Sequence, residues 1–435
     1  MTEAFLNQLA KLLGAEHVVS NARMLEALAT GHAQPGALCK PGSTEEVAAV
    51  VRLAGEHGVP VLPCGGWTAM ALGGEAPEGA LALSLQRLDK MIAYEPADLV
   101  ATAQAGMSFD VFQEALFEHG QTLPLDAPAH ATLGGLVATD RSGPRRLMHG
   151  TLRDMVLGLT VVNGDGVVRK CGGRVVKNVT GYALEKLYIG SLGTLGIVTE
   201  ATFKLRPRPE TASVQEISAP DFGHGFELMR DLAGRLPLAA AVACFPAKPF
   251  SAQLGIEASP PDHARLLKEL EEAAAKAGAE VRETGAERVD ADEYPAVSRR
   301  LESIALPGGE TVAPALAARL SWPAKPADFK TQMDRLDRLA AEAGFGYLMG
   351  YLDFPGFVSL ELFANGGTEA PNLDALVRAL RTDGVPATVS WKSGAQPLSE
   401  PVFGPPRAEW ALMREIKKAL DPRGILNPGR FIAGL

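Results

Sequence analysis

Apolar residues near the start of the chain recur at the period of a helix, and farther along they gather into short continuous runs. Four of them predict a helical lead-in within residues 1–34: Phe5, Leu9, Leu12 and Leu13. A capping box at Ser43–Glu46 predicts a helix that ends at Gly58. The helix leads directly into an apolar strand over 59–62, which we expect Pro63 to stop because proline lacks the N–H that a strand ladder needs.

The next apolar runs predict a second β-α-β-like stretch, with strands at 81–85 and 100–105 and a helix over 109–119. Residues 120–200 differ because glycines occur throughout them. Strands are expected there at 156–162 and 167–171, followed by a helical or turn segment at 182–188.

The pattern changes after Leu205–Pro209, where two prolines indicate a hinge. The strands expected beyond it are 239–245, 253–258, 279–283, 315–322, 347–353, 358–364 and 387–391. The helices expected among them are 262–277, 326–343 and 372–382. This order, β-β-α-β followed by β-α-β-β-α-β, predicts an α+β layer with antiparallel strand pairs. A final helix over 409–420 stops at Asp421-Pro422-Arg423-Gly424, and a tail over 425–431 follows it.

Composition narrows the class of protein. The chain has 435 residues and a net charge of −9, with 46% hydrophobic and 21% charged residues, which excludes a disordered polymer and argues against binding to nucleic acid or anionic membranes. No apolar run has the length of a membrane span, and the start lacks the layout of a signal peptide, so we expect a cytoplasmic protein without direct membrane insertion. The four cysteines lie far apart, which argues against a disulfide framework, a metal site and an iron–sulfur cluster.

Charge is uneven along the chain. Residues 141–177 carry eight Lys or Arg and two acids, a net of +6 that leaves −15 elsewhere. A basic island in an acidic protein favours a bound anion, although a solvated face more often explains such a cluster.

Three glycine-rich segments carry the candidate chemistry. Pro63-Cys64-Gly65-Gly66-Trp67-Thr68 follows a predicted strand, and its backbone N–H groups are able to hold a phosphate, although most Gly-Gly pairs are only turns. The small residues of 126–154 would let the main chain lie flat against a planar ligand; a ligand-free loop bundle is the alternative. The third segment, 172–200, contains Gly-x-x-Gly-x-x-Gly before a strand, which disfavours a nicotinamide-binding Rossmann site because that motif follows a strand and opens a helix.

The order of these motifs resembles the vanillyl-alcohol-oxidase family, whose FAD-binding domain is of the p-cresol-methylhydroxylase type. The resemblance rests on Pro-x-Gly-Gly-x-Thr, Ala-Thr-Leu-Gly-Gly, Val-Lys-Asn-Val-x-Gly-Tyr, Gly-Ser-Leu-Gly-Thr-Leu-Gly and the tail Asp-Pro-Arg-Gly-Ile-Leu-Asn-Pro-Gly-Arg. Within the family the chain looks most like the FAD-binding E subunit of glycolate oxidase (glycolate dehydrogenase), where Ser-Gly-Pro-Arg-Arg also occurs. The fold implied is α+β: a lead-in (1–34), an FAD-binding domain of two subdomains (35–207), an α+β cap with antiparallel sheet (208–402), and a C-terminal helix and tail that return to the FAD domain (403–435).

The resemblance also implies cofactor-binding residues. For the pyrophosphate loop they are Pro63, Cys64, Gly65, Gly66, Trp67 and Thr68. For the flavin and ribityl chain they are Thr132, Gly134, Gly135, Thr139 and Gly143, with Arg145, Gly150, Arg153 and Asp154 beside the cofactor. For the adenosine half they are Gly193, Gly196, Ile197 and Val198, and Asn427 would come from the tail.

Three positions depart from the family pattern. Cys64 stands where relatives often have Arg or Gly, and because no His lies in that loop the FAD is expected to be non-covalent there. Ala183 replaces a frequent Asp. His149 stands where Tyr is frequent, and a structural histidine is favoured over a catalytic one.

The catalytic base stays unassigned. Catalytic relatives bring His-rich motifs from the cap, but this chain has no H-x-H or H-x-x-x-H pair and no histidine after His263, so no metal is expected. Arg299-Arg300 and Arg407 are candidates to clamp a carboxylate, with surface charges as the alternative. Trp322, Tyr347, Tyr351 and Trp391 are expected to fill the core.

Three functions remain open from the sequence. The favoured one is a flavoprotein subunit that oxidises glycolate to glyoxylate together with a sister flavoprotein and passes electrons to an iron–sulfur subunit. These partners would hold it at the inner face of the membrane. The second is a free-standing FAD-dependent oxidoreductase for another alcohol or D-2-hydroxy acid. The third is a non-enzymatic scaffold that keeps the fold but has lost the cofactor. The intact glycine motifs argue against this third function.

Overall fold

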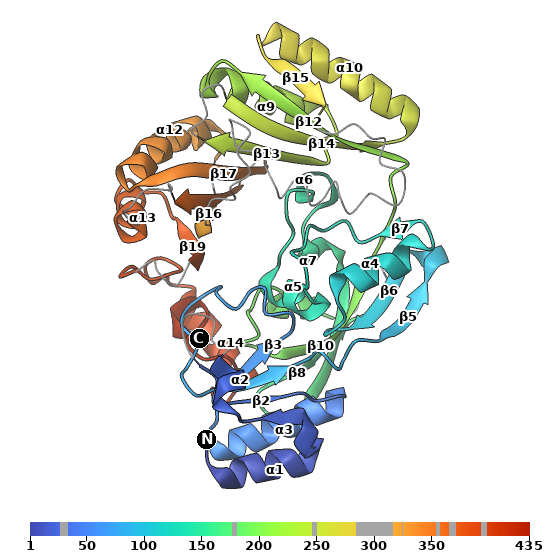
Figure 1. Cartoon of the computed structure of the whole chain (residues 1–435), viewed down its shortest axis with the longest axis vertical. Coiled ribbons are helices and arrows are strands. Elements are labelled where there is room, and N and C mark those ends of the chain that lie inside the picture. Colours follow the sequence, from blue (N-terminus) through green and yellow to red (C-terminus); the bar gives the residue numbers. More distant parts are fainter. Residues whose placement is uncertain are drawn as a thin grey trace. The chain divides into compact units, whose positions relative to one another are not determined.

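The computed structural model describes residues 1–26, 34–175, 181–245, 250–283, 316–323, 325–353, 357–364, 371–392 and 398–435 (Figure 1). The chain divides into two compact units. Unit 1 comprises Met1–Arg141, Thr151–Arg208 and Pro405–Leu435, and unit 2 comprises Ser142–Gly150 and Pro209–Gly404. The division at Arg208 and Gly404 lies within two residues of the boundaries expected at 207 and 402. The short excursion at 142–150 was not expected.

The first sheet of unit 1 has the strand order β1-β2-β4-β3, with β2, β4 and β3 parallel and β1 antiparallel to β2. Its strands are β1 (Val18–Val19), β2 (Ala37–Cys39), β3 (Val61–Cys64) and β4 (Leu81–Ser84). The helices of this part are α1 (Glu3–Leu13), α2 (Ala22–Glu26) and α3 (Thr44–His57). The buried residues of α1 and α3 belong to the same apolar core as those of the strands.

The capping box predicted before α3 is present in part. The Ser43 hydroxyl accepts a hydrogen bond from the Glu46 N–H (3.1 Å), and the Glu46 carboxylate accepts one from the Gly42 N–H (2.6 Å) rather than from Ser43. Gly58 ends the helix in the left-handed conformation, as its sequence position predicts.

Strand β3 does not stop at Pro63, contrary to expectation, but continues through it to Cys64. The reason is its place at the edge of the sheet, where a missing N–H on the outer side breaks no ladder bond. The expected second β-α-β-like stretch is also absent, because β4 completes the first sheet while the next strands form an antiparallel one.

This second sheet of unit 1 has the order β5-β6-β10-β8-β9 and is antiparallel throughout. Its strands are β5 (Met91–Glu95), β6 (Val100–Gln104), β8 (Val156–Val162), β9 (Val168–Gly172) and β10 (Ile197–Lys204). The helices in this region are α4 (Phe109–Phe117), α5 (Leu133–Thr139), α7 (Leu152–Met155) and α8 (Glu185–Tyr188). A short pair, β7 (Gln121–Thr122) with β11 (Arg206–Pro207), completes unit 1.

Unit 2 contains one eight-stranded antiparallel sheet in the order β15-β12-β14-β13-β17-β18-β16-β19. The first half runs β12 (Thr211–Ala219), α9 (Phe222–Arg235), β13 (Ala240–Phe245), β14 (Phe250–Ala258), α10 (Pro260–Lys276) and β15 (Glu280–Glu283). The second half runs β16 (Leu316–Pro323), α12 (Pro326–Glu342), β17 (Phe345–Asp353), β18 (Phe357–Ala364), α13 (Leu373–Thr382) and β19 (Thr388–Lys392).

Both halves of unit 2 are therefore β-α-β-β-α-β units, and their strand orders mirror each other around the β13–β17 pair. The sequence predicts this order for the second half, but its pattern does not indicate β12 and α9. Two glycines in the first turns of α9 obscure its helical pattern, and Gly225 is needed there because a Cβ would lie 2.1 Å from the Phe250 ring. Apolar residues of α9, α10, α12 and α13 share one core with the sheet.

The last helix, α14 (Trp410–Leu420), belongs to unit 1, as expected. Its buried Lys417 ammonium donates to the Asp421 carboxylate (2.6 Å) and to the carbonyl oxygens of Thr194 (2.7 Å) and Leu426 (2.8 Å). This ion pair fixes the start of the C-terminal tail on unit 1. Within the described residues, no helix combines the length and apolar character that a membrane crossing requires.

Candidate functional site

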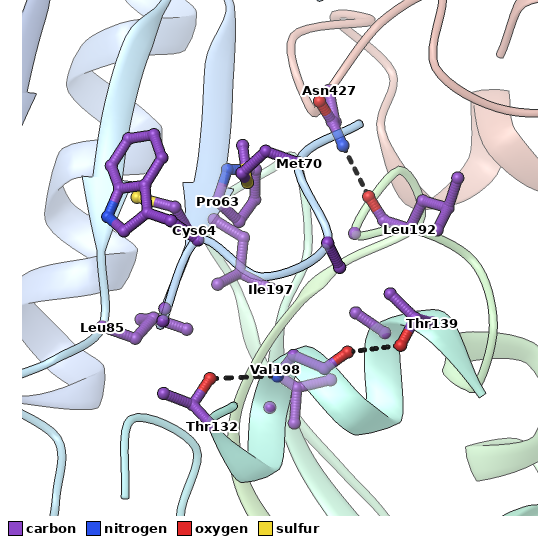
Figure 2. A pocket seen from close by; sticks show the side chains of 18 of the residues that line it. Pro63, Cys64, Met70, Leu85, Thr132, Thr139, Leu192, Ile197, Val198 and Asn427 are labelled. Carbon is purple, nitrogen blue, oxygen red and sulfur yellow. Dashed lines mark hydrogen bonds between the residues drawn. The ribbon is translucent and has the colours of Figure 1, made fainter. Parts of the chain in front are cut away.

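A pocket in unit 1 gathers four segments that are far apart in the sequence (Figure 2). They are the loop after β3, the first and last turns of α5, the loop before β10, and the C-terminal tail; Leu85, directly after β4, also lines the pocket. The lining residues are Pro63, Cys64, Gly65, Gly66, Trp67, Thr68, Ala69, Met70, Leu85, Thr132, Gly134, Gly135, Ala138, Thr139, Leu192, Gly193, Gly196, Ile197, Val198, Asn427 and Arg430.

The loop after β3 lies so close to the segment before α5 that only glycine fits at two of its positions. A Cβ at Gly66 would lie 1.7 Å from the His130 carbonyl oxygen, and one at Gly65 would lie 2.2 Å from the Thr132 hydroxyl. The N–H groups of residues 65–69 donate to no acceptor among the described residues. The loop thus offers a row of free amides, which is the nest that binds phosphate groups in proteins.

Helix α5 forms the floor beside this loop. The Thr132 hydroxyl caps it by accepting from the Gly135 N–H (3.3 Å), and the Thr139 hydroxyl donates back to the Gly135 carbonyl oxygen (2.8 Å), as Figure 2 shows. The Leu192 N–H donates to the Ala138 carbonyl oxygen (2.8 Å), so the loop before β10 covers the end of α5. Because Gly134 and Gly135 carry no side chain, the helix presents its backbone to the pocket.

Backbone strain is concentrated here. Trp67, Leu192 and Asn427 all line the pocket and all have positive φ angles (62°, 53° and 45°), which non-glycine residues rarely adopt. His130, directly behind Gly66, has a φ of 66°. Such strain tends to gather at ligand-binding sites, where the surrounding structure holds it in place.

The C-terminal tail supplies two buried polar side chains. Asn427 is 5% exposed, and its amide nitrogen donates to the Leu192 carbonyl oxygen (2.6 Å; Figure 2), while its Oδ1 atom has no partner among the described residues. Arg430 is 3% exposed and donates to the carbonyl oxygens of Met70 and Leu72, both at 2.6 Å. A buried acceptor without a partner is costly, so a donor from a bound ligand would satisfy it.

Two thiols are buried near the loop. Burial raises the pKa of the Cys64 thiol well above its usual value, and the nearby Cys39 thiol raises it further. The pKa of Cys39 is raised by burial as well. Cys64 is therefore a neutral thiol at physiological pH, which contributes a small apolar surface to the pocket rather than a nucleophile.

The structure brings together fifteen of the twenty cofactor-binding residues that the sequence predicts. They are Pro63, Cys64, Gly65, Gly66, Trp67, Thr68, Thr132, Gly134, Gly135, Thr139, Gly193, Gly196, Ile197, Val198 and Asn427. Arg430 was not predicted, although the tail motif contains it. Its signal was a basic residue three positions after Asn427 in a tail that returns to the FAD domain.

The other five do not line this pocket. Gly143, Arg145 and Gly150 belong to unit 2. Arg153 and Asp154 lie in α7, where the Arg153 guanidinium donates to the Lys186 carbonyl oxygen (2.7 Å) and the Asp154 carboxylate accepts from the Thr151 N–H (2.8 Å). These contacts close a capping box and join α7 to α8.

The segment 142–150 carries a buried polar cluster in unit 2. His149 Nε2 lies 2.9 Å from a Glu257 carboxylate oxygen, and Arg145 Nη1 lies 3.9 Å from the other. The His149 side chain is thus engaged with a buried acid, in line with the structural role favoured from the sequence. Trp322 is 1% exposed, as expected of a core residue, and Arg407 is exposed on unit 1. Arg299-Arg300 lies outside the described residues, as do the side chains of Tyr347, Tyr351 and Trp391.

No group of three or more metal-ligating side chains gathers in the part of the chain that the structure describes. The pocket itself fits a dinucleotide better than a metal. The free backbone N–H groups of the loop after β3 and the buried Arg430 guanidinium suit the diphosphate. The unpaired Asn427 Oδ1 atom suits a hydrogen-bond donor of the ligand, and the backbone left uncovered by Gly134 and Gly135 suits a flat ring.

Comparison with known protein families gives the same cofactor. The model of the FAD binding domain matches residues 35–172, and the model of the C-terminal domain of FAD linked oxidases matches residues 406–431. The first range contains the loop after β3 and α5, and the second contains Asn427 and Arg430. The chain is an FAD-linked oxidoreductase. Its cofactor is FAD.

The curated relatives of this FAD-linked oxidoreductase act on 2-hydroxy acids by name. D-2-hydroxyglutarate dehydrogenase of Xanthomonas citri is 42% identical over 43% of this chain, and the alignment covers only 40% of that relative. D-lactate dehydrogenase of Archaeoglobus fulgidus is 29% identical over 91% of both chains. Glycolate oxidase subunit GlcE of Escherichia coli is 42% identical over 28% of this chain and 36% of its own length.

Solved structures share the fold at low sequence identity. 4-Ethylphenol oxidase from Gulosibacter chungangensis superposes with a TM-score of 0.77 at 16% identity, covering 98% of this chain and 96% of the other. p-Cresol methylhydroxylase superposes with a TM-score of 0.75 at 18% identity, covering 99% and 97%. The predicted fold class, a p-cresol-methylhydroxylase-type FAD-binding domain followed by an α+β domain with antiparallel sheet, is thereby confirmed.

Proposed function

We propose that this FAD-linked oxidoreductase oxidises a small 2-hydroxy acid to the corresponding 2-oxo acid. The observation that carries the proposal is the glycine-lined pocket of unit 1, in a chain that is similar to dehydrogenases of D-lactate and D-2-hydroxyglutarate. FAD, when bound, supplies the acceptor for the hydride that leaves C2 of the substrate.

The chain's own residues hold the cofactor in this proposal. The amides of residues 65–69 bind the diphosphate, and the backbone of α5 lies along the flavin and ribityl part. The Asn427 Oδ1 atom accepts a hydrogen bond from the cofactor. All of these groups line the same pocket in the structure without the cofactor.

For the physiological form of the enzyme we favour a subunit of a glycolate dehydrogenase complex, with a sister flavoprotein and an iron–sulfur subunit as partners. The likeness to two glycolate oxidase subunits supports it: GlcE of Escherichia coli and GlcD of Bacillus subtilis, the latter 36% identical over 48% of this chain. A free-standing D-2-hydroxy-acid dehydrogenase is supported about equally, because the D-lactate dehydrogenase aligns along 91% of both chains.

An exposed apolar stretch of unit 1 supports the proposal of a partner. Six large side chains between residues 167 and 187 are exposed to solvent, three on each side of the gap in the described residues: Val167, Val168, Val175, Tyr182, Leu184 and Leu187. Arg169, Lys170 and Arg174 lie among them. Apolar surface interleaved with positive charge suits an acidic protein surface. We place the complex in the cytoplasm, at the inner face of the membrane through its partners; the free thiols of Cys39, Cys64 and Cys171 suit a reducing compartment.

The test is a substrate screen on the purified, FAD-loaded chain with a dye acceptor. Glycolate, D-lactate and D-2-hydroxyglutarate are each assayed with L-lactate as the matched stereochemical control. Bleaching of the flavin absorption under anaerobic conditions by one of the three supports the proposed reaction. If none of them reduces the flavin, either alone or with the co-expressed partner subunits, the proposed reaction is wrong.

The same assay separates the two forms. Rapid turnover by the isolated chain would contradict the subunit role and support the free-standing enzyme. Turnover only after co-expression with the sister flavoprotein and iron–sulfur subunits, lost in the K170E/R174E variant, would support the complex.

A further inference from the structure

The C-terminal tail forms one wall of the FAD pocket through several backbone contacts. The Val61 N–H donates to the Ile425 carbonyl oxygen and the Asn427 N–H to the Val61 carbonyl oxygen, both at 2.8 Å, so the tail adds to the edge of β3. Farther on, the Gly74 N–H donates to the Arg430 carbonyl oxygen at 2.9 Å. The tail is therefore tied to both ends of the loop that carries the free amides.

Arg430 is the buried cation of this wall. Its side chain donates to the carbonyl oxygens of Met70 and Leu72, and Met70 directly follows the row of free amides at 65–69. The Nε atom has no hydrogen-bond partner among the described residues, and no carboxylate among them lies within ion-pair distance of the guanidinium. The buried cation of α14, Lys417, differs because it is paired with Asp421 at 2.6 Å.

The charge of Arg430 survives burial. Removal from water lowers the pKa of the Arg430 guanidinium to about 10, so the group is still protonated at neutral pH. Carbonyl dipoles satisfy some of its donors but do not neutralise its charge. A buried charge without a counter-ion is strongly unfavourable, which indicates that an anion completes the site.

The pocket that Arg430 lines has a ligand with such an anion. FAD carries two negative charges on its diphosphate, and the free amides beside Met70 are the groups suited to the oxygens of that diphosphate. Amides alone supply partial charges, whereas a guanidinium supplies a full one in a part of the protein that excludes water.

We propose that Arg430 is the counter-cation of the FAD diphosphate, so that the C-terminal tail supplies the charge and the loop after β3 supplies the amides. The proposal rests on FAD as the cofactor and not on the identity of the substrate. It makes Arg430 a cofactor-binding residue that discriminates FAD from uncharged flavins.

The competing interpretation is that Arg430 only fastens the tail to the carbonyl oxygens of residues 70 and 72. Substitution would then weaken every flavin alike, because the whole loop would lose its support. Charge recognition instead predicts a loss confined to ligands that carry phosphate.

The experiment compares wild type, R430Q and R430K with the control R423Q, which removes the same charge from an exposed position of the same tail. Dissociation constants of the apoprotein are measured for FAD and for riboflavin, which lacks phosphate. Inorganic pyrophosphate is added in a separate arm as a probe of the anion site, with the melting temperature as the readout.

We expect R430Q to weaken FAD binding by about 30-fold or more, since removing one member of a buried charge pair has effects of this size. Riboflavin binding should change by less than about threefold, R430K should restore most of the FAD affinity, and R423Q should match wild type. Pyrophosphate should raise the melting temperature of the wild-type apoprotein and of R423Q but not that of R430Q.

Equal losses for FAD and riboflavin in R430Q would overturn the proposal in favour of a mechanical role. Unchanged FAD affinity in R430Q would overturn it as well. If R430Q does not fold, the pyrophosphate measurements on the wild-type protein test the proposal. An anion site is contradicted if pyrophosphate neither stabilises the wild-type apoprotein nor competes with FAD. None of these readouts involves turnover, so a failure of the proposed 2-hydroxy-acid oxidation leaves them interpretable.

Discussion

A methyl group at Gly66 has no room in the structure, because an ideal Cβ would lie 1.7 Å from the His130 carbonyl oxygen. Carbon and oxygen atoms in contact are about 3.3 Å apart, so G66A forces the loop and the His130 segment to separate by roughly 1.5 Å. The obstacle is a backbone atom, and His130 already has a strained φ of 66°. The loop is therefore expected to move rather than the segment behind it.

The displacement has a calculable effect on cofactor binding. A shift of this size breaks the alignment of two or three loop amides with the diphosphate, and a hydrogen bond to a charged group contributes about 1.5–3 kcal/mol. A loss of about 3–4 kcal/mol in total corresponds to an FAD dissociation constant raised several-hundred-fold. Overpacking should also destabilise unit 1 by about 1–3 kcal/mol.

Fluorescence titration of the apoprotein with FAD measures the first effect and thermal melting the second. The matched control is G234A, since Gly234 lies within α9, its Cβ would meet no atom within 4 Å, and alanine favours a helix. G234A should bind FAD like wild type and melt at the same or a higher temperature. G66A that binds FAD within threefold of wild type would refute the role given to the loop.

Three further predictions concern the surroundings of the pocket. K417M leaves the buried Asp421 without its cation, so we expect a loss of about 3–5 kcal/mol in the free energy of unfolding and a higher dissociation constant for FAD. K418M, at the exposed neighbouring position, should behave like wild type in denaturant melts. Partial burial opposes ionisation of Asp154, but hydrogen bonds from Thr151 and the charges of Lys186 and Arg153 outweigh it and lower the pKa of Asp154 below the usual 3.8. Because the pKa is lower in the folded state, the stabilisation by this carboxylate is present above pH 3.8 and is lost as the pH falls through the lower value. D154N should therefore reduce the melting temperature at pH 7 and have no effect in strong acid. Burial raises the pKa of the Cys171 thiol to about 11, yet Cys171 is partly exposed, so iodoacetamide should label Cys171 before the buried Cys64, as read by peptide mass mapping. FAD should slow the labelling of Cys64 alone. Equal protection of both thiols would place the cofactor elsewhere.

The sequence predicts most of the lining of the pocket because positions that have no room for a Cβ must be glycine, and such glycines are visible in the sequence. Gly65 and Gly66 are glycines because the Thr132 side chain and the His130 backbone leave no room for a Cβ, and this requirement is visible as an adjacent pair after a strand. The tail residue Asn427 was found through the family motif. Arg430 was missed because a basic residue near a C-terminus is usually exposed, and its burial depends on tertiary contacts with residues 70–72.

The errors in the fold have related causes. The pattern of apolar residues predicts most elements of unit 2 well. It predicts the end of β3 too early, because Pro63 is tolerated only at the edge of the sheet, and the strand order that puts β3 there depends on the whole sheet. Helix α9 was missed because its glycines serve packing against Phe250 rather than a turn. The excursion of 142–150 into unit 2 depends on the pairing of His149 with Glu257, two residues more than one hundred positions apart.

We infer that the loop after β3 and the C-terminal tail together bind one FAD. Equilibrium titration of the purified wild-type apoprotein with FAD is the decisive measurement. Saturation is expected at one FAD per chain. No uptake of FAD by the folded chain, or uptake by G66A equal to that of wild type, would contradict it.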